Sequence, residues 1–175
     1  MKNLENETLV FDNNVLSNFA RIERLDLIIG LPCNLFTTRE VFEELQDGIK
    51  AYSITKPELA SKLSKAVEII NQGKITIQSP STLKSFELYA NLESLGHFGK
   101  GEISAMVLAK EIDAFFIADE KQAKKESIKQ NIKILDKKEF KDTVIILQYL
   151  NSQRIISKND FQQIKNDLKN NSFLF

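Results

Sequence analysis

The sequence predicts an α/β fold of three layers, in which helices cover both faces of a parallel sheet and further helices follow at the C-terminal end. Short apolar runs alternate with segments of helical periodicity, and this alternation is typical of parallel sheets. The 175 residues, of which 42% are hydrophobic, suffice for one domain with a full core. No internal repeat or low-complexity linker interrupts the pattern. We expect four to five strands in the order 3-2-1-4-5.

Three strands are expected in the first half of the chain, each a short apolar run followed by a helix. Thr38 can cap the helix after the second strand, which continues at helical spacing up to Gly48. Gly73 is the expected stop of the helix after that. The expected strands are Thr8–Phe11, Leu35–Thr37 and Lys74–Gln78, and the expected helices are Asn13–Arg21, Glu23–Ile29, Arg39–Gly48 and Pro57–Asn71.

The second half of the chain is expected to add two strands and a helical end. Ser157 and Asp160 have the spacing of a capping box for the last helix. The expected strands are Phe115–Ala118 and Lys133–Leu135, and the expected helices are Ser81–Leu95, Glu102–Ile112, Glu120–Gln130, Lys138–Asn151 and Lys158–Asn170. We therefore expect an α/β domain at residues 1–137 and a C-terminal helical extension, residues 138–175, packed on the same domain.

Four acidic residues are the candidates for chemistry. Asp12 and Asp119 each close a buried apolar run, whereas Glu44 and Glu102 lie in the opening turns of helices. With the expected strand order, the first and fourth strands are neighbours, so the four carboxylates converge at one edge of the sheet. Such a cluster repels itself unless a hard cation such as Mg²⁺ neutralises it. Two cations there can activate water and stabilise a leaving oxygen, which predicts a metal-dependent phosphodiesterase.

Two other interpretations of these acids compete with a metal site. Asp12 and Asp119 can cap the helices that follow them, and Glu102 is favourable at a helix N-terminus through the dipole alone. Capping demand alone does not account well for four acids at one sheet edge. A phosphatase with Asp12 as its nucleophile needs a second Asp two residues on, where Asn14 stands instead.

Composition excludes several classes of site. Cys33 is the only cysteine and His97 the only histidine, which rules out an internal disulfide and a classical zinc site. Lys and Arg balance Asp and Glu at 24 each, so no global field attracts nucleic acid. Eight lysines crowd residues 121–141, as a solvated helix face or as a rim that meets substrate phosphates. No apolar stretch approaches the ~20 residues of a membrane span, so we expect no membrane partner and a cytoplasmic protein.

The surroundings of the four acids form motifs. They are Asp12-Asn13-Asn14-Val15-Leu16-Ser17, Val41-Phe42-Glu43-Glu44-Leu45, Gly101-Glu102-Ile103-Ser104-Ala105 and Ile117-Ala118-Asp119-Glu120. In this order and spacing they resemble the four motifs of the PIN domain, the metal-dependent nuclease fold of VapC-type toxins and related ribonucleases. The second motif places its acid directly before Leu, which selects Glu44 rather than Glu43. The similarity covers about residues 8–135, and the remaining helices resemble a prokaryotic PIN subgroup with a helical C-terminal extension.

The resemblance implies a Mg²⁺- or Mn²⁺-dependent endoribonuclease that cleaves single-stranded or structured RNA. Asp12, Glu44, Glu102 and Asp119 then serve as catalytic metal ligands. Glu120 is a fifth ligand, a group that positions water or a helix-start acid. Asn14 and Ser17 are expected to orient the carboxylates or the scissile phosphate from behind the ligands.

The resemblance also implies partners. As the toxin half of a toxin–antitoxin pair, the protein would bind a cognate antitoxin besides RNA, and it would form a homodimer. The dimer is expected to form through apolar helix faces near the N-terminus or in the C-terminal helices. The apolar stripe of the C-terminal helices otherwise packs on its own domain; its members are Val144, Leu147, Leu150, Phe161, Ile164 and Leu168. The alternative function is a PIN-like binding or scaffold module with little activity.

Overall fold

A parallel sheet lies at the centre of the computed structural model, which describes residues 4–139 and 141–171. Its strands run in the order β3-β2-β1-β4, as the sequence predicts for the first four. The bounds are β1 (Thr8–Phe11), β2 (Asn34–Thr37), β3 (Thr76–Ile77) and β4 (Phe115–Ile117). The predicted α/β/α fold class is confirmed.

The register brings the ends of β1 and β4 side by side. Phe11 pairs with Ile117, and the next backbone amide, that of Asp12, donates to the Ile117 carbonyl over 2.9 Å. Both strands are fully buried from their second residue on, which is why their sequences are continuous apolar runs. The residues that follow them, Asp12 and Asp119, therefore leave the sheet at the same edge.

The predicted fifth strand is reduced to a single bridge. Lys133 pairs in parallel with Phe115 and accepts a 2.9 Å hydrogen bond from the Phe116 amide. The chain then turns away, because the Asp136 carboxylate accepts hydrogen bonds from the amides of Lys138 and Glu139, at 2.6 and 3.0 Å. This turn also delays the next helix, which was expected from Lys138 and begins at Asp142.

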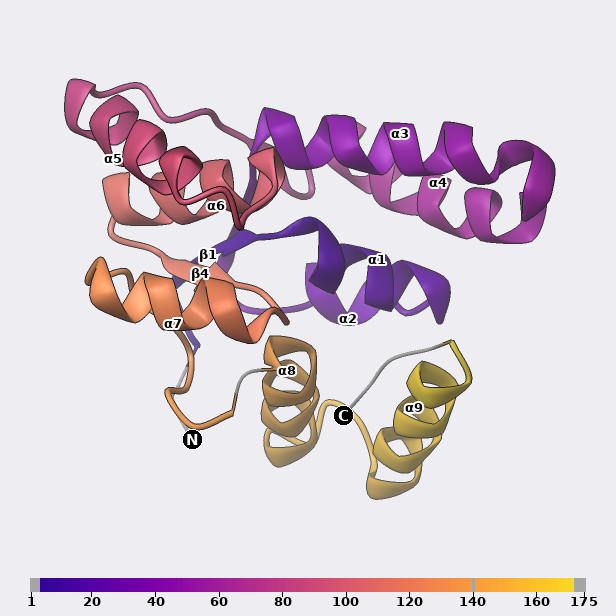
Figure 1. Ribbon diagram of the computed structural model, residues 1–175. Coiled ribbons are helices and arrows are strands. Elements are labelled where there is room, and N and C mark those ends of the chain that lie inside the picture. Colours follow the sequence, from indigo (N-terminus) through magenta and orange to yellow (C-terminus); the bar gives the residue numbers. More distant parts are fainter. Residues whose placement is uncertain (1–3, 140, 172–175) are drawn as a thin grey trace.

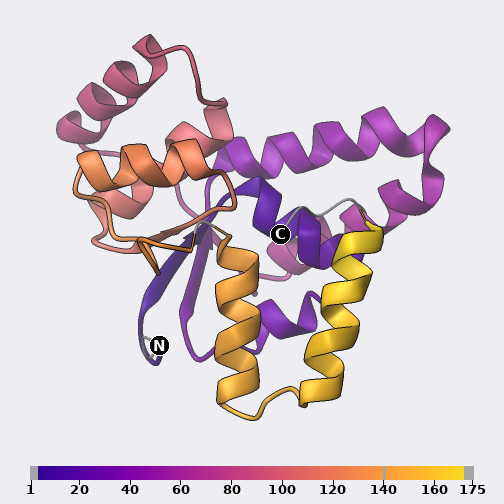
Figure 2. The same cartoon turned by 60° about the horizontal axis from the view of Figure 1, so that its bottom comes forward.

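Helices enclose the sheet (Figure 1). In that view α3, α4, α5 and α6 lie above the strands and α7, α8 and α9 below, and Figure 2 shows α8 and α9 as an antiparallel hairpin. The bounds are α1 (Asn13–Arg21), α2 (Asp26–Ile29), α3 (Arg39–Thr55), α4 (Pro57–Asn71), α5 (Leu83–Ser94), α6 (Lys100–Glu111), α7 (Lys121–Lys129), α8 (Asp142–Ser152) and α9 (Lys158–Asn170).

Helix α3 is longer than predicted. It passes through Gly48, which was expected to end it, and stops at Thr55 because Pro57 forces the preceding residue out of the helical region. Gly48 instead faces α4: a Cβ built on it would lie 3.9 Å from a methyl carbon of Leu63. The expected cap is present, since the Thr38 hydroxyl accepts from the Val41 amide.

The C-terminal hairpin packs on the rest of the chain. Of the apolar stripe in α8 and α9, five members are buried and Phe161 is partly buried against the same core. The stripe is thus used within the chain and is not exposed for a partner. The predicted capping box of Ser157 and Asp160 is confirmed. Among the described residues, no helix combines the length and apolarity needed to cross a membrane.

Candidate active site

Asp12 and Asp119 lie at the carboxyl edge of the sheet and are almost entirely buried, with 3% and 4% of their surface exposed. Neither acts as a helix cap. Asp12 occupies the N-cap position of α1 but its side chain makes no capping hydrogen bond, and the N-cap of α7 is Glu120. Because burying a carboxylate is costly, a role other than capping has to compensate for it.

Asp119 is held by three hydrogen bonds from two other helices. Its Oδ1 accepts from the Thr143 amide at 3.0 Å, and its Oδ2 accepts from the Thr143 hydroxyl at 2.6 Å and the Asn18 amide group at 2.8 Å. Burial raises the pKa of Asp119, and these donors work against that rise. Sequence reasoning missed Asn18 and Thr143. Asn18 could have been predicted, because it lies one helical turn beyond the predicted site residue Asn14. No local sequence pattern indicates a role for Thr143.

A buried ion pair fixes the start of α8, and with it Thr143. Lys124 Nζ lies 2.5 Å from Asp142 Oδ1, both side chains being fully buried, and it also donates to the Glu139 carbonyl. The other oxygen of Asp142 accepts from the Ala118 amide at 2.9 Å, directly before Asp119. Lys124 belongs to the lysine-rich stretch that was expected to be exposed, and its burial corrects that expectation. The desolvation cost of a buried ion pair offsets much of its attraction, so this pair fixes the position of α8 more than it adds to the stability of the fold.

Glu44 reaches the site from α3 and lies against the start of α6. Its Oε1 accepts from the Gly101 amide at 2.8 Å. The two helices are further joined by the Thr38 and Ser104 hydroxyls, whose oxygens lie 2.6 Å apart. The neighbouring acid, Glu43, is exposed and lies 3.6 Å from Arg39 on another helix face. Gly101 has no room for a side chain, because a Cβ there would lie 2.6 Å from Glu44 Oε2.

The electrostatics are those of an uncompensated acidic cluster. Burial, followed by the charge of Asp12 and then that of Glu120, raises the pKa of Glu102 to about 8. Burial also raises the pKa of Asp12 to about 7. The amides of Asn13 and Asn14 work against this rise, and the charges of Glu44 and Asp119 add to it. The charges of Glu44 and Asp119 therefore oppose the ionisation of Asp12, and those of Asp12 and Glu44 oppose the ionisation of Glu102. This coupling is the condition that a bound cation relieves.

The other predicted site residues surround this cluster. Glu120 is exposed and acts on Glu102 through its charge. Asn14 is exposed and lines a cavity of about 190 Å³ together with Ser17, Asn18 and Glu44. The Ser17 hydroxyl donates to the Asn13 side chain at 2.8 Å, so its hydrogen bond is to a residue of the same helix, α1.

Cys33 and His97 are not part of the acidic cluster. The Cys33 thiol donates to the Leu4 carbonyl at 3.0 Å, and burial raises its pKa to about 11, with a smaller effect from Glu7. A thiol with so high a pKa is a poor nucleophile. The His97 ring lies against the neighbouring Phe98 ring in an edge-to-face arrangement.

The donor set fits a hard divalent cation in chemistry and charge. All four acids offer oxygen, which Mg²⁺ and Mn²⁺ prefer. Burial and the neighbouring acids raise the pKa values of Asp12 and Glu102, and a bound cation would offset both effects. Across residues 4–139 and 141–171, no three acidic, histidine or cysteine side chains have already closed into a group that could hold a metal. Binding would therefore draw the carboxylates together.

Comparison with known proteins bears on the same residues. The family model of a PIN domain matches residues 8–175, which includes β1 with Asp12 as well as α8 and α9. No curated protein matches the chain. The match thus covers the sheet edge with its acids and the helical end that supplies Thr143.

Proposed function

The chain belongs to the PIN-domain family, a family of generally metal-using nucleases, and on this premise we propose that it is a Mg²⁺- or Mn²⁺-dependent endoribonuclease. Asp12, Glu44, Glu102 and Asp119 are the proposed metal ligands and catalytic residues. The single observation that carries the proposal is the placement of the acids: Asp12 and Asp119 lie buried at the ends of the neighbouring strands β1 and β4, and the charges of Glu44 and Glu102 act at the same place. A bound cation would offset the cost of burying such carboxylates.

Each residue has a distinct part in the proposed reaction. Asn18 and Thr143 hold both oxygens of Asp119 in place, and Gly101 orients Glu44 through its amide. Asp12 and Glu102 give up the protons that they hold near neutral pH when they become ligands. When bound, the cations supply Lewis acidity for water activation and for the developing charge on the phosphate.

The decisive experiment is cleavage of labelled single-stranded RNA by the purified chain. We expect cleavage with Mg²⁺ or Mn²⁺ and none in EDTA. Asp12→Asn should lower turnover by orders of magnitude, and Glu43→Gln, on the exposed face of the same α3 helix as Glu44, is the matched control and should retain it. Activity that persists unchanged in EDTA would show that the metal mechanism is wrong.

A second candidate is a binding or scaffold module with little activity. One observation favours it: in the part of the chain that the structure describes, the acids have not converged into a metal-holding group. The two candidates can be distinguished by measuring thermal stability as Mn²⁺ is added and then assaying RNA cleavage. A scaffold module would gain thermal stability from Mn²⁺, or remain indifferent to it, without cleaving RNA, whereas the nuclease gains both stability and turnover.

We also propose that the protein is the toxin of a toxin–antitoxin pair, acting on RNA in the cytoplasm as a homodimer. Support comes from the likeness of its motifs to VapC-type toxins. A small DNA-binding protein encoded next to this chain would strengthen the proposal, and co-expression with it should silence the RNA cleavage. An active enzyme that is harmless to its host cell when expressed alone contradicts the toxin role.

A further inference from the structure

A second cavity adjoins the acidic site. The cavity beside Glu44 and Asn18, described above, shares the lining residues Arg21 and Tyr52 with a larger one of about 600 Å³. The larger cavity lies between the end of α1, the α3–α4 turn and the end of α9. Its volume falls in the range of ~300–1,000 Å³ typical of ligand pockets. The two cavities adjoin at Arg21 and Tyr52, and together we call them the α1–α3 groove.

Arg21 is the central cation of this groove. Its side chain lines both cavities, and its Nε is buried without a hydrogen-bond partner in the described part of the chain. A buried donor without a hydrogen-bond partner costs free energy. A ligand that supplies an acceptor to this donor recovers that free energy on binding. Guanidinium groups match the geometry of phosphate oxygens, to which they can bind in bidentate fashion.

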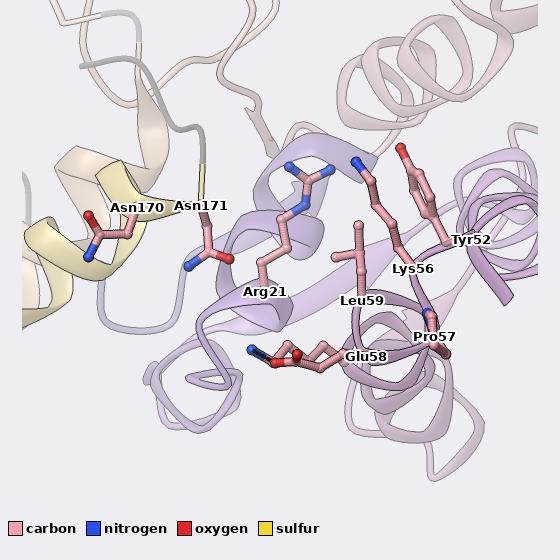
Figure 3. Close-up of a pocket in the computed structure, with 9 residues that line it drawn as sticks. Arg21, Tyr52, Lys56, Pro57, Glu58, Leu59, Asn170 and Asn171 are labelled. Atoms are coloured by element: carbon pink, nitrogen blue, oxygen red, sulfur yellow. Dashed lines mark ion pairs between the residues drawn. The ribbon is translucent and has the colours of Figure 1, made fainter. Parts of the chain in front are cut away.

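Lys56 and Tyr52 complete the groove. Lys56 lies with its Nζ 5.7 Å from the centre of the Tyr52 ring. Figure 3 shows the ends of Arg21, Lys56 and Tyr52 extending in the same direction, while Asn170 and Asn171 approach from α9. Of the other charged lining residues, Lys62 pairs with Glu58 at 3.0 Å, and Glu44 belongs to the acidic site. Among the described residues no ion pair joins Arg21 or Lys56 to an acid, so the groove carries two available cations and one aromatic ring.

We propose that the α1–α3 groove binds the single-stranded RNA that flanks the phosphate to be cleaved, with Arg21 and Lys56 on backbone phosphates and Tyr52 under a base. This inference rests on the proposed nuclease function. Proteins that bind single strands combine cations that follow the backbone with aromatic rings on which bases stack. A duplex keeps its bases paired and cannot offer one to Tyr52, so the groove selects single strands. It also gives an electrically neutral chain a local means of binding a polyanion.

The test is RNA binding in EDTA, where metal-dependent cleavage does not occur. Fluorescence anisotropy with labelled single-stranded RNA, single-stranded DNA and duplex RNA compares wild type with Arg21→Ala/Lys56→Ala. Arg24→Ala/Lys50→Ala is the matched control: it removes the same charges from the same region, but these two side chains pair with Asp26 and Asp47 outside the groove. We expect the groove variant, but not the control variant, to bind single-stranded RNA at least about tenfold more weakly than wild type. Because two phosphate contacts are lost, the slope of log affinity against log salt concentration should become shallower by about 1.4.

A second pair of variants tests the ring and does not depend on charge. Tyr52→Phe keeps the ring and should bind as wild type does, whereas Tyr52→Leu should lose about tenfold. Melting temperatures of all variants identify any that fail to fold. Lys56→Glu, at an exposed position between α3 and α4, tests the charge effect separately and should also weaken single-strand binding. Equal affinity of wild type for duplex and single strand would overturn the proposal.

The proposal and the proposed function fail in different ways. If the wild type cleaves RNA but the groove and control variants bind and cleave alike, the groove proposal is wrong and the nuclease stands; a protein segment is then the better candidate occupant. If the wild type cleaves nothing with Mn²⁺, the nuclease is wrong, while the anisotropy in EDTA still reports whether the groove binds RNA. In an active enzyme the groove variant should raise KM far more than it lowers kcat.

Discussion

At the scale of single residues, the acids of the site differ in the hydrogen bonds and charges around their carboxylates. Asp119 receives three side-chain and backbone hydrogen bonds, whereas burial, with a smaller contribution from neighbouring acids, dominates the pKa values of Asp12 and Glu102. Their pKa values of about 7 and about 8 lie above the values of the unfolded chain. The folded protein therefore holds protons that the unfolded chain releases, and stability without metal falls as pH rises from about 4.5 to 8.

Replacing Glu102 with Gln should remove part of that penalty. The charge of Glu102 destabilises the fold only where the unfolded chain is ionised, above pH ~4.5, and its full cost is reached above the folded pKa of about 8. In EDTA, we expect Glu102→Gln to melt at a higher temperature than wild type at pH 8.5 and at nearly the same temperature at pH 4.5. The variant should be inactive. A lower melting temperature at both pH values would mean that Glu102 is a stabilising helix-start acid.

Thr143 tests how strictly Asp119 must be held. Thr143→Val keeps the shape and the backbone donor but deletes the hydroxyl that donates to Asp119 Oδ2 over 2.6 Å. Losing such a support for a ligand typically costs about 10- to 100-fold in metal affinity or activity. We expect a higher Mn²⁺ concentration at half-maximal activity for Thr143→Val and recovery with Thr143→Ser. Equal metal requirements for all three proteins would show that the amide and Asn18 are sufficient.

At the scale of elements, the junction of α3 with α6 places Glu44. The Thr38 and Ser104 hydroxyls join the two helix starts, and the Gly101 amide then meets Glu44. Because α3 begins where β2 ends, this junction places Glu44 relative to the carboxyl edge of the sheet. Gly101 is needed for its lack of a side chain, not for an unusual backbone conformation, since it lies within α6.

Two glycines on either side of Lys100 separate these effects. Gly101→Ala puts a Cβ 2.6 Å from Glu44 Oε2 and must displace that carboxylate, whereas the Cβ of Gly99→Ala would lie an ordinary 3.6 Å from Glu44 Oε1. We expect Gly101→Ala to lose most RNA cleavage with little change in melting temperature, and Gly99→Ala to retain it. Full activity of Gly101→Ala would indicate that Glu44 need not stay where it is.

At the scale of the whole molecule, the C-terminal helices take part in the site. Helix α8 begins at Asp142, which is tied to Lys124 and to the strand end at Ala118, and its next residue holds Asp119. The helices of the predicted extension thus supply both packing and a ligand support. Their apolar stripe is buried within the chain, which leaves other surfaces for self-association.

The proposed homodimer should have twice the chain mass of 20.0 kDa in sedimentation at micromolar concentration. Helix α5 offers the exposed apolar side chains Leu83 and Phe86, at 75% and 58% exposure, as a surface that a second copy can cover. Leu83→Glu/Phe86→Glu should then sediment as a monomer, while Ile54→Glu, 90% exposed on α3, should not change the mass. A wild-type mass near that of one chain contradicts the dimer.

The sequence by itself determined the parallel sheet, most helix positions and the placement of Asp12 and Asp119 beyond neighbouring strands. These features follow from local patterns, since buried strands must be apolar and helices need periodic apolar faces. Only the tertiary structure decided that Gly48 lies within α3, that the fifth strand shrinks to one bridge, and that Lys124 is buried. It also decided which groups hold Asp119, because Asn18 and Thr143 lie 101 and 24 residues away along the chain. A hydrogen bond between such distant residues depends on how the elements pack, and no local periodicity carries that information.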